Sequence, residues 1–102
     1  MHQNIYQPGF YGSLKHTEIR ERILAEGFDP IQIDDPAGHI YPPHRHSETK
    51  LLAFLNGGME VHVADQTYQC AASDRLLIPG NVEHSAHVMS DGCVYFWSEK
   101  LT

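Results

Sequence analysis

The sequence has no hydrophobic run that approaches the roughly 18 residues of a membrane-spanning helix. Its start, MHQNIYQPGF, also lacks the charged segment followed by an apolar segment that is typical of a secretory signal. The chain contains two cysteines, Cys70 and Cys93, and no CxxC pair. These absences argue against a membrane span and a disulfide framework, and they predict a cytoplasmic protein with two free thiols.

Basic residues are also few. The chain has 7 Lys and Arg against 13 Asp and Glu, which gives a formal net charge of −6 with neutral histidines. Nucleic acids and anionic membranes would meet net repulsion, so we expect neither as a partner. Histidine, in contrast, is abundant, with 8 imidazoles in 102 residues. The imidazoles are therefore the first candidates for a functional site.

The length of 102 residues suits a single domain with one core. Residues 1–29 are expected to form an N-terminal arm and one helix. The helix is predicted over residues 14–26, because Ile19 and Ile23 fall on one face of it and Gly27 ends it.

Residues 30–102 are expected to form the barrel. Their apolar runs are short and recur at roughly the 8–12-residue spacing of an all-β sandwich or barrel. Turn residues separate most of these runs. They predict a hairpin at Asn56-Gly57-Gly58 and a turn at Ser90-Asp91-Gly92.

The run LLAFL, residues 51–55, is apolar at every position. A strand with one face in water alternates between apolar and polar residues, so both faces of this strand are expected to be covered. Leu52 and Phe54 would face the barrel core, and the other three residues would face an outer cover. That cover is either the N-terminal helix or a second copy of the chain. Because so short a chain has few residues to spare, we expect a homodimer.

Candidate functional side chains are most concentrated in residues 38–50, GHIYPPHRHSETK. Side chains alternate along an extended chain, so His44 and His46 share a face, and the Pro-Pro pair before them keeps the chain extended. Two imidazoles so placed occupy neighbouring positions around one metal ion, and His84 or His87 would supply a third from another strand. Such a set suits zinc, iron, nickel, copper or manganese.

Two motifs resemble those of the cupin superfamily. The first cupin motif is a glycine, five residues, His-x-His, three or four residues, a glutamate, six residues and a glycine; the matching positions here are Gly38, His44-x-His46, Lys50 and Gly57. The second is a glycine, five residues, Pro-x-Gly, two residues, a histidine, three residues and an asparagine; the matching positions here are Ser73, Pro79-x-Asn81, His84 and Val88. The chain is identified as a small single-domain cupin of the conserved-barrel type. The resemblance implies an all-β double-stranded β-helix, a jelly-roll barrel, to which the sequence adds one N-terminal α-helix.

By this resemblance His44, His46 and His84 would be metal ligands, and Lys50 would occupy the place of the usual glutamate ligand. A lysine must lose its proton before it coordinates a metal, but three histidines remain a workable site, as in iron-binding subgroups of cupin-like dioxygenases. Glu48, on the same strand face, would restore a carboxylate. Alternatively, Lys50 pairs with Glu48, holds the carboxylate of a small acid, or acts as a base or Schiff-base amine.

The residues and the resemblance together predict a metal-binding small-molecule barrel, with Lys50 and Glu48 as catalytic candidates. As an enzyme it would be an isomerase, hydrolase or dioxygenase that uses Zn, Fe, Ni or Mn on a small carboxylate, enol or sugar-like substrate. One alternative is a non-catalytic ligand-binding module, similar to the sensor domains of sugar-responsive regulators. The other is a metal-free degenerate cupin whose histidines bond to each other or to water.

Overall fold

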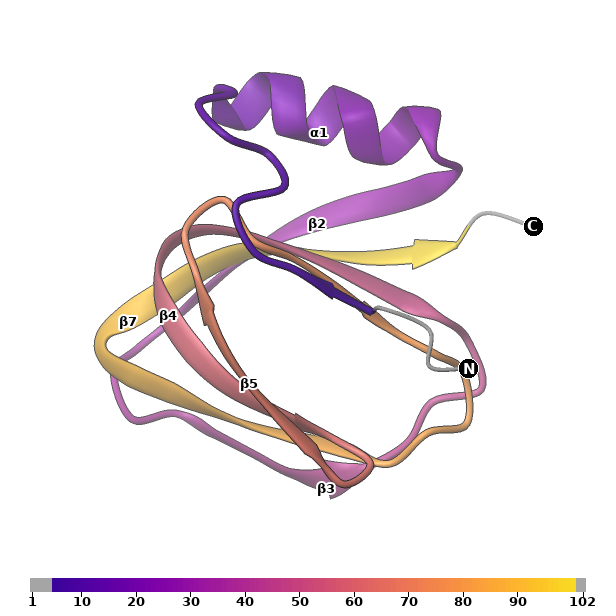
Figure 1. Ribbon diagram of the computed structural model, residues 1–102, viewed down its shortest axis with the longest axis vertical. Coiled ribbons are helices and arrows are strands. Elements are labelled where there is room, and N and C mark those ends of the chain that lie inside the picture. The colour runs from indigo at the N-terminus through magenta and orange to yellow at the C-terminus, as the bar shows by residue number, and fades with distance from the viewer. Residues whose placement is uncertain (1–4, 101–102) are drawn as a thin grey trace.

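The computed structural model describes residues 5–100, so the first four residues of the predicted arm and the last two of the predicted barrel segment lie outside the described residues. The elements, in chain order, are β1 (Tyr6–Gln7), α1 (His16–Ala25), β2 (Phe28–Asp35), β3 (Ile40–His44), β4 (Lys50–Val63), β5 (Gln66–Ala71), β6 (Arg75–Ile78) and β7 (His84–Lys100). Strands surround a common interior, and α1, the one helix within residues 5–100, lies outside them (Figure 1). The prediction of an all-β fold with one N-terminal helix is confirmed. No helix in this part of the chain is long and apolar enough to cross a membrane.

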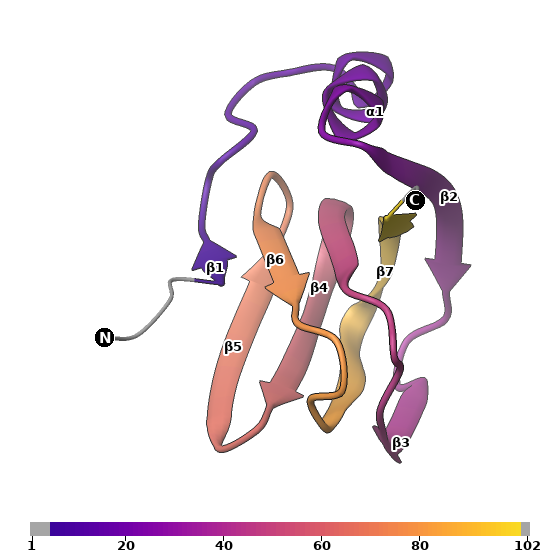
Figure 2. The same ribbon diagram turned by 90° about the vertical axis from the view of Figure 1, so that its right-hand side faces the viewer.

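The long strands β4 and β7 form the central pair of the sheet (Figure 2). They run antiparallel from the pair Lys50–Glu99 to the pair Val63–His84. On one side, β6 and then β1 extend the sheet from β4, and β5 pairs with the second half of β4. On the other side, β2 and β3 pair with different parts of β7. This topology places the end of β3 beside the start of β7, where His44 is the register partner of His84.

The predicted hairpin at Asn56-Gly57-Gly58 and the predicted turn at Ser90-Asp91-Gly92 are wrong. Both segments lie inside continuous strands, β4 and β7, whose pairing passes through two register shifts in this region. Gly57 has a φ of +74°, and a Cβ on it would lie 2.0 Å from the carbonyl oxygen of Gly92. Glycine here allows two backbones to approach closely at a bulged bend, and it does not reverse the chain.

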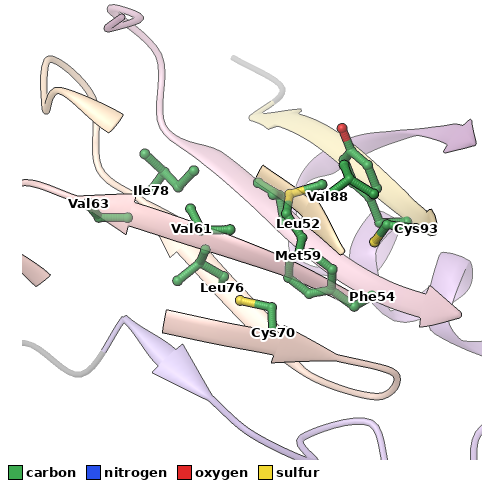
Figure 3. Packing of buried hydrophobic residues seen from close by; sticks show 11 residues of the cluster. Leu52, Phe54, Met59, Val61, Val63, Cys70, Leu76, Ile78, Val88 and Cys93 are labelled. Carbon is green, nitrogen blue, oxygen red and sulfur yellow. The ribbon is translucent and has the colours of Figure 1, made fainter. Parts of the chain in front are cut away.

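Apolar side chains form two clusters on opposite faces of the β4–β7 pair. The inner cluster, which fills part of the barrel, includes Leu52 and Phe54 from the run LLAFL (Figure 3). The outer cluster contains the other three residues of the run together with residues of the arm, the helix, β2 and β7: Leu51, Ala53, Leu55, Tyr11, Ile19, Ile23, Phe28 and Phe96. The prediction that both faces of this strand are covered is therefore confirmed.

The cover of the outer face is the helix α1 of the same chain. Its Ile19 and Ile23 are at most 1% exposed and pack onto the sheet, and Tyr11 of the arm joins them. The expectation of a homodimer rested on a second copy covering this face. That reason is removed, because Ile19 and Ile23 of the helix and Tyr11 of the arm already cover it.

Candidate metal site and cavity

His44, His46 and His84 lie together at one end of the barrel interior. His44 ends β3, His84 begins β7, and His46 lies in the loop between β3 and β4. The ring centroids are 4.3 Å apart for His44 and His84, 4.7 Å for His44 and His46, and 5.1 Å for His46 and His84. One potential ligand nitrogen from each ring lies within 4.8 Å of the other two. His87, the alternative third imidazole, is exposed and does not belong to this group.

Two loops fix the position of His46. The backbone N–H of Asn81 donates a 2.6 Å hydrogen bond to the carbonyl oxygen of His46. Gly80 allows this contact, because a Cβ there would lie 2.4 Å from the carbonyl oxygen of Ser47. Asn81, which stands where the cupin motif has a glycine, has a φ of +63°, and asparagine tolerates this left-handed conformation.

The hydrogen bonds of the rings leave nitrogen lone pairs free. His44 Nδ1 lies 2.6 Å from the carbonyl oxygen of Pro42, and His84 Nδ1 lies 3.0 Å from that of Val82. A carbonyl only accepts, so each Nδ1 carries the proton and each Nε2 keeps a lone pair. The Nε2 atoms of His46 and His84 are buried without a hydrogen-bond partner among the described residues. Since carbonyl bonding of the far ring nitrogen is how ligating histidines are oriented, these residues fit a divalent metal.

The surroundings favour the neutral form of the buried rings. Burial lowers the pKa of His46 below the usual 6.5, and the neighbouring His44 and His84 act in the same direction. Burial also lowers the pKa of His84, against the opposing effect of its bond to the carbonyl of Val82. The nearby charge of Lys50 lowers both pKa values further. Neutral imidazole is the form that binds metal, so no proton has to be displaced at neutral pH.

Lys50, at the motif position of the cupin glutamate, is buried, with 3% of its surface exposed. Its ammonium pairs with Glu99, its register partner on β7, and lies 3.5 Å from Oε1 of Glu48. It also lies 5.4 Å from the centroid of the Trp97 ring. Two carboxylates around one ammonium leave a net negative charge, which weakens the repulsion that the ammonium would exert on a nearby cation.

Glu48 belongs to this ion-pair group and not to the group of imidazoles. Its side chain is exposed, and its Oε2 accepts a 2.7 Å hydrogen bond from the hydroxyl of Ser47. That bond is the largest cause that lowers the pKa of Glu48, and Lys50 adds to it. Glu48 is therefore an ionised carboxylate at the rim, close to Lys50.

A cavity of about 250 Å³ lies inside the barrel beside the imidazoles. Most of its wall is apolar or aromatic and consists of Ile33, Leu52, Met59, Val61, Ile78, Ala86, Tyr41, Tyr95 and Trp97. The volume lies just below the usual range for ligand pockets, so a small molecule fits it. Tyr41 and Met59 line the cavity, whereas Tyr68 and Phe96, which also lie on strands, do not.

Sequence reasoning missed Tyr95, Trp97 and Glu99, which share one face of β7. The ring of Trp97 lies 5.6 Å from that of His46, and Glu99 pairs with Lys50. The alternation of these residues was visible in the sequence. The register with β4, which places Glu99 opposite Lys50, was not.

Comparison with known proteins identifies the family. The model of the AraC-like ligand binding domain matches residues 31–99. No curated protein sequence matches the chain. Among solved structures, an RmlC-like cupin from Shewanella frigidimarina is similar, with 18% identity and a TM-score of 0.67 over 74% of this chain and 68% of that one. The cupin domain of Cnp3 from Schizosaccharomyces pombe has 17% identity and a TM-score of 0.67 over 74% of this chain and 57% of that one.

Oxalate decarboxylase from Bacillus subtilis, a protein with Mn(II) centers, has 18% identity and a TM-score of 0.67 over 80% of this chain and 23% of that one. The chain thus spans less than two thirds of the Cnp3 and decarboxylase chains. At these identities the structural likeness shows the fold, and it confirms the predicted jelly-roll barrel. With the family model matching most of its length, the chain belongs to the AraC-like ligand binding domain family and is a small cupin-superfamily protein.

Proposed function

We propose that the chain is a metal-dependent cupin barrel that acts on a small carboxylate or enol, with His44, His46 and His84 as metal ligands. The buried Nε2 atoms of His46 and His84, which lack hydrogen-bond partners, carry this proposal. A buried polar atom without a partner costs free energy, and one divalent cation would satisfy both nitrogens. The apolar wall disfavours a sugar-like substrate, because many of its hydroxyl groups would lose their hydrogen bonds.

Lys50 would bind and orient the anionic group of the substrate. Its ammonium has three N–H donors, and its two carboxylate partners are each about half exposed, so a substrate carboxylate can displace one of them. Glu48 is then the group placed to accept a substrate proton, at Oε1. Trp97 lines the wall beside His46 and would exclude water there. When bound, the metal would supply a Lewis acid or, as iron, a centre for oxygen chemistry.

Titration of the metal-free protein with Co²⁺ tests the ligand set, because the visible absorption of Co²⁺ reports its coordination. We expect one equivalent to bind, and His84→Ala to weaken binding by about a hundredfold or more. The matched control is His87→Ala, which removes an exposed imidazole outside the group and should leave the affinity unchanged. A folded protein that takes up no Co²⁺ overturns the proposal in favour of a metal-free cupin. Undiminished binding by His84→Ala overturns the ligand set.

A non-catalytic ligand-binding role is the second candidate, and the match to a ligand binding domain favours it. The two roles share the cavity and differ in turnover. A small acid that raises the unfolding temperature of the metal-loaded protein and is recovered unchanged supports the binding role. Product formation that is lost in Glu48→Gln, while the acid still binds, supports the enzyme.

A further inference from the structure

Three strands bring a second group of polar side chains to the cavity. Asp35 ends β2, Tyr41 lies on β3 and Tyr95 on β7. The Tyr41 hydroxyl donates to Oδ2 of Asp35 over 2.6 Å, and the Tyr95 hydroxyl donates to the same oxygen over 3.2 Å. The two hydroxyl oxygens are 3.0 Å apart. Both tyrosines line the cavity, whereas Asp35 stands behind them, 8% exposed.

This group lies at a distance from the imidazoles. On β7, Tyr95 is two residues from Trp97, which contacts His46, and a strand rises roughly 7 Å over two residues. On β3, Tyr41 precedes His44 by three residues, or roughly 10 Å of extended chain. Between the two groups the cavity wall is mostly apolar. A ligand in the cavity therefore finds polar partners mainly at two separated poles.

The hydrogen bonds within the group of Asp35, Tyr41 and Tyr95 determine whether it offers a ligand donors or acceptors. Each tyrosine has one hydroxyl proton. That of Tyr41 goes to Asp35, and that of Tyr95 goes to Asp35 or to the Tyr41 oxygen, so both protons are used within the group. The hydroxyl oxygens retain lone pairs that accept hydrogen bonds. The hydrogen bonds to the carboxylate behind them polarise the hydroxyl groups and make these oxygens stronger acceptors. Burial is the largest cause that raises the pKa of Tyr41 and of Tyr95, and the hydrogen bond between Tyr41 and Asp35 raises that of Tyr41 further, so both stay neutral.

We infer that Asp35, Tyr41 and Tyr95 select ligands that carry a hydrogen-bond donor at the end opposite their metal-binding group. The inference rests on the proposed function, because it concerns the ligand of the same cavity. The chemical class is a hydroxy- or amino-substituted aromatic or cyclic carboxylate about one six-membered ring in length. Its carboxylate lies at the imidazole end, and its O–H or N–H donates to the tyrosine oxygens.

Three related acids test this selection in the Zn²⁺-loaded protein: 4-hydroxybenzoate, 4-methoxybenzoate and benzoate. The last two lack a donor and are respectively larger and smaller than the first, so a preference for 4-hydroxybenzoate over both does not come from size. Trp97, the single tryptophan of the chain, lines the cavity and reports binding by its fluorescence. We expect 4-hydroxybenzoate to bind about tenfold more tightly than either analogue.

In Tyr95→Phe, and separately in Tyr41→Phe, this preference should fall to about threefold or less. Tyr68→Phe is the matched control, because Tyr68 packs outside the cavity and its loss of a hydroxyl should leave the preference intact. Equal binding of the three acids by the wild type, or a full preference in both cavity variants, overturns the inference and leaves the proposed function standing. Binding of none of the acids by the Zn²⁺-loaded protein counts against both.

Discussion

The two faces of the β4–β7 pair are filled in different ways, although they alternate residue by residue. On the outer face, Leu51 and Ala53 are fully buried under α1 in a cluster whose one polar side-chain atom is the hydroxyl oxygen of Tyr11. On the inner face, the neighbouring Lys50 enters an ion-pair group, and the barrel keeps a cavity with imidazoles and tyrosine hydroxyls around it. Close packing stabilises, whereas cavities and buried polar groups cost stability. We therefore expect the outer face to carry more of the stability and the inner face to carry the chemistry.

The largest effect that separates the faces is expected for Ile23→Ala. Ile23 is fully buried in the outer cluster, so its truncation should lower the free energy of unfolding by about 2–5 kcal/mol. Urea denaturation measures this loss, and Co²⁺ titration of the folded fraction should show an unchanged affinity. Leu24→Ala, at a helix position with 39% exposure, should change stability by about 0.5 kcal/mol or less. An altered Co²⁺ affinity in Ile23→Ala would show that the faces are coupled.

On the inner face, Lys50→Glu should change the affinity for Co²⁺, which Ile23→Ala leaves unchanged. It replaces the ammonium with the carboxylate that the cupin motif places there, so we expect Co²⁺ to bind about tenfold more tightly, or ~1.4 kcal/mol. Because Glu48 and Glu99 lose their cation, the metal-free variant should be less stable than the wild type, and Co²⁺ should restore the difference.

Lys50→Met is the control for this substitution, since it removes the charge without adding a ligand and should give an intermediate affinity. Parallel Co²⁺ titrations and thermal unfolding of the folded variants supply the comparison. Weaker Co²⁺ binding by Lys50→Glu than by the wild type would show that position 50 does not point at the metal site.

The inner face was partly predictable from the sequence because its key residues obey local rules. Strand alternation put His44 and His46 on one face, and the second motif supplied His84. Pairing between distant strands was not predictable in the same way: Lys50 meets Glu99, 49 residues away, only through the register of β4 and β7. The sequence left the helix and a second copy open as the outer cover, because a helix with two fully buried residues gives a weak signal in sequence.

A smaller effect concerns pH. The folded-state pKa values of His46 and His84 lie below the usual 6.5. Between those values and 6.5 the unfolded chain binds protons that the folded chain does not, so the unfolding free energy of the metal-free protein falls as the pH falls. The slope is at most about 1.4 kcal/mol per pH unit for each proton.

Urea denaturation between about pH 7 and pH 5.5, above the range in which carboxylates titrate, measures this slope. The variant His46→Asn/His84→Asn should flatten the profile, and the outer cluster, which contains no imidazole, contributes nothing to it. A wild-type profile that is flat, or one that rises toward acid pH, would contradict the assignment of neutral rings to the folded state.

The smallest expected effect is that the two cysteines of the inner face do not react with a thiol reagent, which would show that this part of the inner face is closely packed. Cys70 and Cys93 belong to the inner cluster and are 3% and 2% exposed. Burial raises the pKa of both thiols, that of Cys93 to about 12, so neither forms a thiolate readily. We expect no stoichiometric reaction with Ellman's reagent in the native protein, and reaction of both thiols across the same urea transition that circular dichroism reports.

In Ile23→Ala the onset of thiol reaction should move to a lower urea concentration together with global unfolding, because β4 and β7 belong to both faces and neither face can open alone. Labelling that precedes the transition would mean that the inner face opens without global unfolding. The two faces would then not unfold together, and the comparison of their contributions to stability would fail.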